Sequence, residues 1–177
     1  MKDKKVYLIG FMGAGKSTIA PILADKLGLE WVDTDNIIEQ KEGLTIPEIF
    51  EYYGEDRFRE LEREVVEEVS ESGPKVVAVG GGAPMDEENW GRMKSTGEVV
   101  YLEIGPEEVL GRVGSDGNRP LLAGLNRQER REKINRLLQI RHPRYNQADH
   151  VVLCNGTGTA ALADEIVRRL EEDNDQS

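Results

Sequence analysis

A glycine-rich segment near the start of the chain constrains its fold more than any other feature. Residues 10–17 read GFMGAGKS; they follow the apolar run Val6–Ile9 and precede an alanine-rich stretch with helical spacing. This satisfies the G-x-x-x-x-G-K-[S/T] pattern in the context that gives it meaning, a buried strand before the loop and a helix after it. The segment predicts a loop that holds the phosphates of a nucleoside triphosphate. The alternative is a glycine-rich turn that binds no ligand.

The chemistry of this loop assigns roles to its residues. Unpaired N–H groups and the helix dipole at a helix N-terminus favour an anion, and glycines let the backbone curl around it. Lys16 supplies a charge for the β- and γ-phosphates, and the Ser17 hydroxyl is a candidate Mg²⁺ ligand. The predicted nucleotide contacts in this segment are Gly13, Ala14, Gly15, Lys16, Ser17 and Thr18.

The order of apolar segments predicts an α/β fold. Short, unbroken apolar runs alternate with stretches of helical spacing, which is typical of a parallel sheet covered by helices on both faces. We expect strands at 6–9, 29–33, 76–79, 99–102 and 151–153, and helices at 18–27, 35–42, 45–53, 55–72, 86–94, 106–113, 127–141 and 160–170. The 177 residues suit a single domain. Its active site should lie beyond the carboxyl ends of the strands.

Two carboxylates leave the tip of the second predicted strand in the sequence Asp33-Thr34-Asp35. One can hold Mg²⁺, and the other can accept the proton of an attacking hydroxyl. The alternative is a helix N-cap, for which Asp is a favoured residue. Their place beside a phosphate loop favours the functional interpretation.

Further candidates follow along the chain, each with a structural alternative. The run Gly80-Gly81-Gly82 is either a plain turn or a backbone surface for a ligand. Arg59 and Glu62, at i,i+3, form either a surface ion pair or a fork that meets a substrate carboxylate. Residues 112–125 contain Arg119 and suit either a surface loop or a mobile lid. Arg141, near a helix C-terminus, fits that position regardless of function.

Composition excludes several classes of partner. The net charge of −11 argues against nucleic acid, which requires a basic face. The sequence has no signal-peptide core and no apolar run long enough for a membrane span, so we expect a cytoplasmic protein without membrane contact. The single cysteine, Cys154, fits a reducing compartment. We expect a monomer whose residues 171–177 form an acidic tail.

Taken together, these motifs resemble the shikimate kinase family from Val6 to about Val152. The matched elements are the phosphate loop, D-T-D, G-E-x-x-F-R-x-x-E, G-G-G, R-P-L-L and R-x-P-x-Y. The resemblance implies a single P-loop kinase domain over 1–177, with the architecture of the nucleoside monophosphate kinases. Within it, a shikimate-binding region would span about 33–62 and a lid about 112–125. It also implies transfer of the γ-phosphoryl of ATP to the 3-hydroxyl of shikimate, in aromatic amino acid biosynthesis, with Mg²⁺ as cofactor.

The resemblance also implies residue roles. Asp35 is similar to the residue that activates the hydroxyl, and Lys16 and Arg119 to those that stabilise the transferring group. Arg59 and Arg141 resemble the clamps on the shikimate carboxylate, with Gly81 and Gly82 as backbone donors. Ser17 and Asp33 would hold Mg²⁺, and Arg112 would contact the nucleotide.

The chain departs from the family pattern at three places. The turn after the last strand reads Cys154-Asn155-Gly156-Thr157-Gly158, the interval from Tyr145 to Ala148 is one residue short, and position 144 is Arg rather than apolar. Arg144 therefore competes with Arg141 as the clamp, although we favour Arg141. Rival interpretations are another small-molecule kinase, such as a gluconate or nucleoside monophosphate kinase, a switch GTPase or binding module, and a non-catalytic homologue. The chain lacks the N-K-x-D guanine signature, and its D-x-x-G match at residues 25–28 lies at the end of the helix predicted at 18–27.

Overall fold

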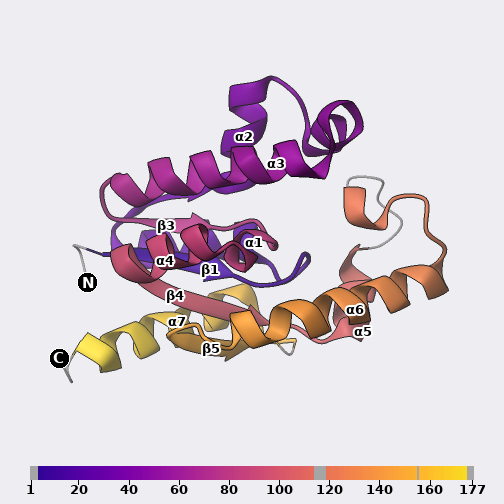
Figure 1. The fold of residues 1–177 in the computed structure, drawn as a ribbon. Coiled ribbons are helices and arrows are strands. Elements are labelled where there is room, and N and C mark those ends of the chain that lie inside the picture. Colours follow the sequence, from indigo (N-terminus) through magenta and orange to yellow (C-terminus); the bar gives the residue numbers. More distant parts are fainter. Residues whose placement is uncertain (1–3, 114–118, 155, 175–177) are drawn as a thin grey trace.

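Five parallel strands form one twisted sheet at the centre of the computed structural model, which describes residues 4–113, 119–154 and 156–174 (Figure 1). The sheet has the order β2-β3-β1-β4-β5, and each neighbouring pair is parallel. Its strands are β1 (Lys5–Ile9), β2 (Glu30–Asp33), β3 (Lys75–Ala78), β4 (Gly97–Glu103) and β5 (His150–Leu153). The predicted α/β class and five-stranded parallel sheet are confirmed.

The described residues form seven α-helices and two short 3₁₀ turns; six of the helices lie between strands, and α7 follows the last strand. The helices are α1 (Lys16–Leu27), α2 (Thr34–Glu42), α3 (Ile46–Glu71), α4 (Glu87–Thr96), α5 (Pro106–Val113), α6 (Arg127–Tyr145) and α7 (Thr159–Asn174). The turns are η1 (Ala83–Met85) and η2 (Pro120–Leu122). The helices predicted at 45–53 and 55–72 form the two parts of α3, which is interrupted by non-helical backbone at Gly54 (φ 81°, ψ 174°).

Helix α6 continues four residues beyond its predicted end. Pro143 disfavours a helix that continues beyond Arg141, since proline weakens the preceding helical turn. Arg141 and Tyr145, one turn apart, are nevertheless both buried, at 5% and 0% exposure. Packing of this face therefore outweighs the local cost of Pro143, and it carries two large side chains to the end of the sheet.

Each face of the sheet has its own apolar core. Alternate residues of β1 point to opposite faces, so that Val6 and Leu8 join one cluster and Tyr7 and Ile9 the other. The first cluster packs against α1 and α7, and the second against α3 and α4. Burial on both faces explains why the central strands read as unbroken apolar runs.

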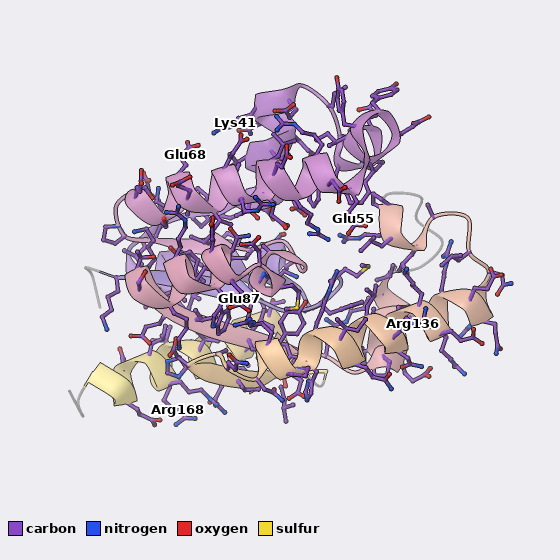
Figure 2. All side chains as sticks on the ribbon, viewed as in Figure 1. Lys41, Glu55, Glu68, Glu87, Arg136 and Arg168 are labelled. Atoms are coloured by element: carbon purple, nitrogen blue, oxygen red, sulfur yellow. The ribbon has the colours of Figure 1, made fainter. Side chains whose placement is uncertain are left out.

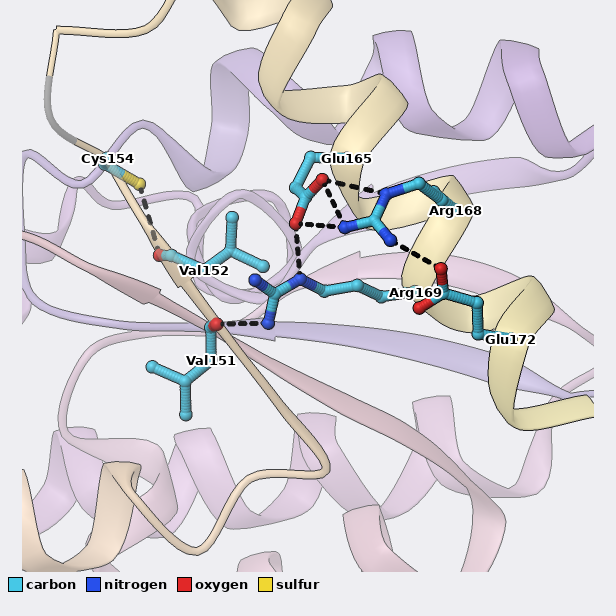
Figure 3. Close-up of polar contacts among 7 residues, drawn as sticks. All are labelled: Val151, Val152, Cys154, Glu165, Arg168, Arg169 and Glu172. Carbon is cyan, nitrogen blue, oxygen red and sulfur yellow. Dashed lines mark hydrogen bonds and ion pairs between the residues drawn. The ribbon is translucent and has the colours of Figure 1, made fainter. Parts of the chain in front are cut away.

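The C-terminal helix α7 is fixed to the edge strand β5 by a charged group as well as by apolar contacts. Arg169 donates a hydrogen bond of 2.7 Å to the carbonyl oxygen of Val151 and one of 2.6 Å to Glu165 (Figure 3). Arg168 bridges Glu165 and Glu172 on the same helix (Figure 3). Among the described residues, no helix is long and apolar enough to cross a membrane.

Candidate active site

Three loops that follow neighbouring strands meet at one end of the sheet. Strand β3 lies between β1 and β2, so the turn at Gly80 is flanked by the glycine loop after β1 and by Asp33-Thr34-Asp35 after β2. The carboxyl ends of adjacent parallel strands share one edge, which is where ligands bind in such sheets. The three motifs that the sequence singled out are therefore brought together.

The glycine loop curls directly into the N-terminus of α1. Gly15 forms the N-cap with a left-handed backbone (φ 91°), which an L-residue with a side chain rarely adopts. The Nζ atom of Lys16 donates hydrogen bonds of 2.8 Å to the carbonyl oxygen of Gly10 and 3.0 Å to that of Phe11. Burial lowers the pKa of Lys16 to about 8, although the nearby Asp35 carboxylate opposes the shift. The two carbonyl oxygens thus hold the ammonium group inside the loop.

Asp33 serves two purposes. One carboxylate oxygen caps α2 by accepting hydrogen bonds from the backbone N–H groups of Asp35 (2.9 Å) and Asn36 (3.3 Å). The other accepts a short hydrogen bond from the hydroxyl of Ser17 at the start of α1. The cap and the functional interpretation, which the sequence posed as alternatives, are thus compatible.

The side-chain oxygen atoms of Ser17 and Asp33 are suitable ligands for a magnesium ion. The described residues contain no group of three or more His, Cys, Asp and Glu side chains that could hold a metal. Mg²⁺ in phosphate-transfer sites needs no such cage, because it keeps several waters and takes oxygen ligands from substrate phosphates. One hydroxyl and one carboxylate beside a phosphate loop are a fitting protein contribution.

Two joined pockets occupy this end of the sheet, with volumes of about 430 and 600 Å³. The first follows the glycine loop, and the second lies between α2, α3 and the glycine turn after β3. They share one wall, made of Met12, Ser17, Asp33, Asp35, Gly80, Gly81 and Arg119. A group bound in one pocket can therefore meet a group bound in the other at this wall.

The first pocket contains every residue predicted to contact a nucleotide: Gly13, Ala14, Gly15, Lys16, Ser17, Thr18, Arg112 and Arg119. Arg112, at the end of α5, also donates a 3.1 Å hydrogen bond to the carbonyl oxygen of Gly13. Sequence reasoning did not assign seven further residues to this pocket: Met12, Ile19, Val79, Cys154, Thr157, Thr159 and Leu162. The signal for Cys154 and Thr157 was weak, because the turn that contains them departs from the family pattern, and Thr159 and Leu162 belong to the helix after it.

The second pocket contains the predicted binders of an acidic substrate. Arg59 lies beside Gly82, so close that a Cβ atom on Gly82 would collide with its guanidinium. Glu62, which is 1% exposed, accepts a 2.7 Å hydrogen bond from Arg59. The predicted ion pair is therefore present, but it is largely buried. Phe50 and Phe58 add an aromatic wall that the sequence interpretation did not include, with ring centroids 4.9 Å apart.

Arg141 lines the second pocket, whereas Arg144 points elsewhere. The guanidinium of Arg141 lies over the ring of Phe11, 5.4 Å from its centroid. That of Arg144 forms an ion pair with Glu87 at the start of α4 and lies over the Trp90 ring at 5.2 Å. Figure 2 shows Glu87 between α4 and α6. The departure at position 144 thus leaves Arg141 as the arginine of α6 in the pocket.

Two carboxyl groups at the glycine turn, the half-buried Asp35 and the buried Glu62, have raised pKa values. Burial, reinforced by Asp33, raises the pKa of Asp35 to about 6 against the attraction of Lys16. Burial raises the pKa of Glu62 to about 7 in spite of Arg59. One oxygen of each carboxyl is buried and has no hydrogen-bond partner among the described residues. Such oxygens are suited to accept a proton or hydrogen bond from a bound hydroxyl.

The predicted lid is described only in part. Arg119 is exposed and lines both pockets from the residue before η2, and Pro120 and Leu121 line the second pocket. Residues 114–118 of the lid lie outside the described residues, as do Asn155 of the turn after β5 and residues 175–177 of the predicted acidic tail.

Comparisons with known proteins agree with this geometry. A family model described as shikimate kinase matches residues 12–171. The shikimate kinase of Synechococcus sp. (strain RCC307) is 41% identical over 171 residues, which cover 96% of this chain and 86% of that protein. A solved structure of shikimate kinase from Acinetobacter baumannii in complex with shikimate is 39% identical, with a TM-score of 0.92 and coverage of 96% and 94%. A gluconokinase from Sinorhizobium meliloti 1021, at 16% identity, TM-score 0.62 and coverage of 97% and 93%, shares the fold alone.

Proposed function

The chain belongs to the shikimate kinase family, and we propose that it transfers the γ-phosphoryl group of ATP to the 3-hydroxyl of shikimate across the wall that its two pockets share. The observation that carries the proposal is the composition of this wall. It contains a carboxylate for the acceptor hydroxyl, the two candidate magnesium ligands and an arginine. The reaction would supply shikimate 3-phosphate to aromatic amino acid biosynthesis.

ATP binds in the first pocket in this proposal. Its phosphates lie along the N–H groups of residues 13–18, and Lys16 moves from its loop carbonyls to the β- and γ-phosphates. The helix dipole of α1 and the lysine charge both favour these anions. Arg112 holds the nucleotide from α5, which agrees with its place in the pocket lining.

Shikimate binds in the second pocket, with its carboxylate between Arg59 and Arg141. Arginine suits this task because its planar fork can bond both oxygens of a carboxylate. The backbone of Gly81 and Gly82 would contact the ring hydroxyls. Glu62 holds Arg59 in place through their 2.7 Å hydrogen bond. A small anionic polyol is thereby fixed with one hydroxyl at Asp35.

Transfer then requires positioning and charge stabilisation more than covalent help. The 3-hydroxyl oxygen attacks the γ-phosphorus while its proton passes to the Asp35 carboxylate, and the bond from phosphorus to the ADP oxygen breaks. Lys16 and Arg119 stabilise the negative charge on the transferring group. Mg²⁺, held by Ser17 and Asp33, would neutralise charge on the phosphates. Closure of residues 112–125 over the pockets would exclude water.

The first experiment is coupled ADP release with Mg-ATP, with shikimate, gluconate, a nucleoside monophosphate or no acceptor. We expect rapid ADP formation with shikimate alone. Comparable rates with another acceptor would overturn the substrate assignment, and ADP release that no acceptor accelerates would overturn the transfer. We also propose a cytoplasmic monomer, and light scattering of the purified protein tests the monomer directly.

A further inference from the structure

We infer that Thr34 is a positioning residue, whose buried hydroxyl fixes the catalytic carboxylate of Asp35 against the glycine turn after β3. The inference rests on the proposed function, since it concerns how that site is held in place. Thr34 lines neither pocket, and its side chain is 0% exposed. It would therefore act through its neighbours.

The hydroxyl of Thr34 extends the sheet beyond the point where the backbone can do so. Strands β2 and β3 pair in parallel up to Asp33 and Ala78. Helix α2 begins at Thr34, the residue after β2 ends. Val79 donates its N–H to Leu8 of β1 at 3.0 Å, on the other side of β3. The N–H of Gly80 turns toward β2, where Thr34 Oγ1 accepts it at 3.0 Å. A side chain thus takes the place of a backbone carbonyl in the ladder.

This hydrogen bond is buried, which makes its loss costly. A buried N–H without a partner loses the hydrogen bonds that water would otherwise give it, at about 1–3 kcal/mol. Removal of the Thr34 hydroxyl alone would leave the Gly80 N–H without its hydrogen-bond partner. Water could not readily replace that partner, because Thr34 is 0% exposed. We therefore expect the glycine turn and the start of α2 to shift relative to each other until the N–H finds a partner.

Such a shift would act directly on the reacting groups. An oxygen of Asp35 lies 2.9 Å, and one of Glu62 2.7 Å, from the point where a Cβ atom on Gly80 would stand. These are the two carboxyl oxygens without a partner among the described residues. Both carboxylates thus pack against Gly80, and Thr34 directly precedes Asp35 in the chain. A displacement of about 1 Å of reacting groups can lower the rate of transfer by about 100-fold.

The other side chains that hold the glycine turn connect it to different elements. Tyr145 of α6 donates a 2.5 Å hydrogen bond to the carbonyl oxygen of Gly81, and Asn89 of α4 donates one of 3.1 Å to that of Ala83. Neither adjoins a residue proposed to react. Thr34 joins the turn to Asp35 itself, which distinguishes it from these two supports.

The test compares variants of Thr34 that keep or lose the acceptor oxygen. Thr34→Val preserves shape and removes the hydroxyl, and Thr34→Ser keeps the hydroxyl and removes a methyl group. We expect kcat to fall about tenfold or more in Thr34→Val and to stay within about threefold of wild type in Thr34→Ser. The Kd for ATP should stay within about threefold in both, because the glycine loop is separate from this bond.

The matched control is Thr96→Val at the opposite end of the sheet. The Thr96 hydroxyl bonds the Tyr7 hydroxyl and the carbonyl oxygen of Arg92, both at 2.7 Å, so its loss lowers stability without reaching the pockets. We expect Thr96→Val to lower the thermal midpoint while kcat stays unchanged. A purely structural role for Thr34 would give that same pattern in Thr34→Val, and would overturn the inference.

Two further outcomes are decisive. Equal losses of kcat in Thr34→Ser and Thr34→Val would assign the effect to packing and contradict the role of the hydroxyl. If Thr34→Val does not fold, Thr34→Cys replaces the acceptor with a weak one of similar size, and wild-type kcat in that variant would also contradict the inference. Failure of the wild-type protein to phosphorylate shikimate would instead overturn the proposed function, so the two failures are distinguishable.

Discussion

The hydroxyl of Ser17 donates a hydrogen bond to the carboxylate of Asp33, and this bond joins the first turn of α1 to the end of β2. These residues are 16 positions apart in the chain. The proposed magnesium ligands are therefore already in contact, one beside the phosphate loop and the other beside the carboxylate that would receive the proton. Asp33 also caps α2. A substitution that tests its role in metal binding must therefore remove the negative charge and keep the helix cap.

Asp33→Asn makes that separation, because asparagine is as good an N-cap as aspartate but carries no charge. We expect the Mg²⁺ concentration for half-maximal rate to rise about tenfold or more, while the thermal midpoint changes little. The measurement is initial rate against Mg²⁺ at fixed ATP. The control is Asp86→Asn, which alters the equivalent cap of α4 outside both pockets. An unchanged Mg²⁺ requirement in Asp33→Asn would remove this carboxylate from the metal site.

Asp35→Asn should slow transfer strongly and leave nucleotide binding intact. The amide cannot accept the proton of the attacking hydroxyl, and general bases contribute about 10²–10⁴-fold to rate. We expect kcat to fall by that factor and the Kd for ATP, from calorimetric titration, to stay within about threefold. Asp25→Asn, on the exposed part of α1, is the control for the loss of one negative charge. Retained turnover in Asp35→Asn would exclude this residue as the base.

The local motifs could be predicted from the sequence because each has a mechanism that needs few residues. The glycine loop requires a strand before it and a helix after it, and both can be recognised from apolar spacing within residues 6–27. The parallel sheet follows from the unbroken apolar strands. All predicted site residues line one of the two pockets, because the carboxyl ends of adjacent strands share an edge.

The contacts between distant segments could not be predicted in the same way. The pairing of Arg144 with Glu87, 57 residues away, depends on how α6 crosses α4, and no local pattern encodes that angle. The same holds for Thr34 and Gly80, 46 residues apart, whose bond depends on the register of β2 against β3. The length of α6 was missed because the burial of Tyr145 outweighs the local effect of Pro143.

Arg59→Ala should mainly weaken binding of the acceptor. Hydrogen bonds to charged groups contribute about 1.5–3 kcal/mol, so the KM for shikimate should rise about 10- to 100-fold. The KM for ATP should change little, since Arg59 lines only the second pocket. Arg57→Ala is the control, because Arg57 pairs with Glu60 on the same helix but lines neither pocket. An unchanged KM for shikimate in Arg59→Ala would place the substrate carboxylate elsewhere.

Arg141→Ala and Arg144→Ala should separate substrate binding from structural support on one helix. Arg141 lines the second pocket, and Arg144 pairs with Glu87 and Trp90. We expect Arg141→Ala to raise the KM for shikimate at least tenfold. Arg144→Ala should leave that KM within about twofold and lower stability by about 0.5–1.5 kcal/mol, through the lost ion pair and cation–π contact. A large rise of KM in Arg144→Ala would mean that both arginines hold the carboxylate.

The buried carboxyl of Glu62 should make stability depend on pH in a defined direction. Burial, with a further contribution from Asp35, raises its pKa to about 7 from the usual 4.5, against the opposing charges of Arg59 and Arg141. Below pH 4.5 the group is protonated in both the folded and unfolded chain, and its contribution to stability is complete. As pH rises, the unfolded chain releases this proton first, so the contribution declines and is lost once pH passes about 7.

Glu62→Gln removes the titration and keeps the shape of the side chain. Its free energy of unfolding should therefore rise relative to wild type by about 2 kcal/mol between pH 5 and pH 8. Urea unfolding of both proteins at pH 5, 6, 7 and 8 measures this difference. Glu60→Gln, on the exposed side of the same helix, controls for the loss of one carboxylate from α3. A difference that stays constant with pH, or falls as pH rises, would show that the Arg59 pair and not burial dominates the state of Glu62.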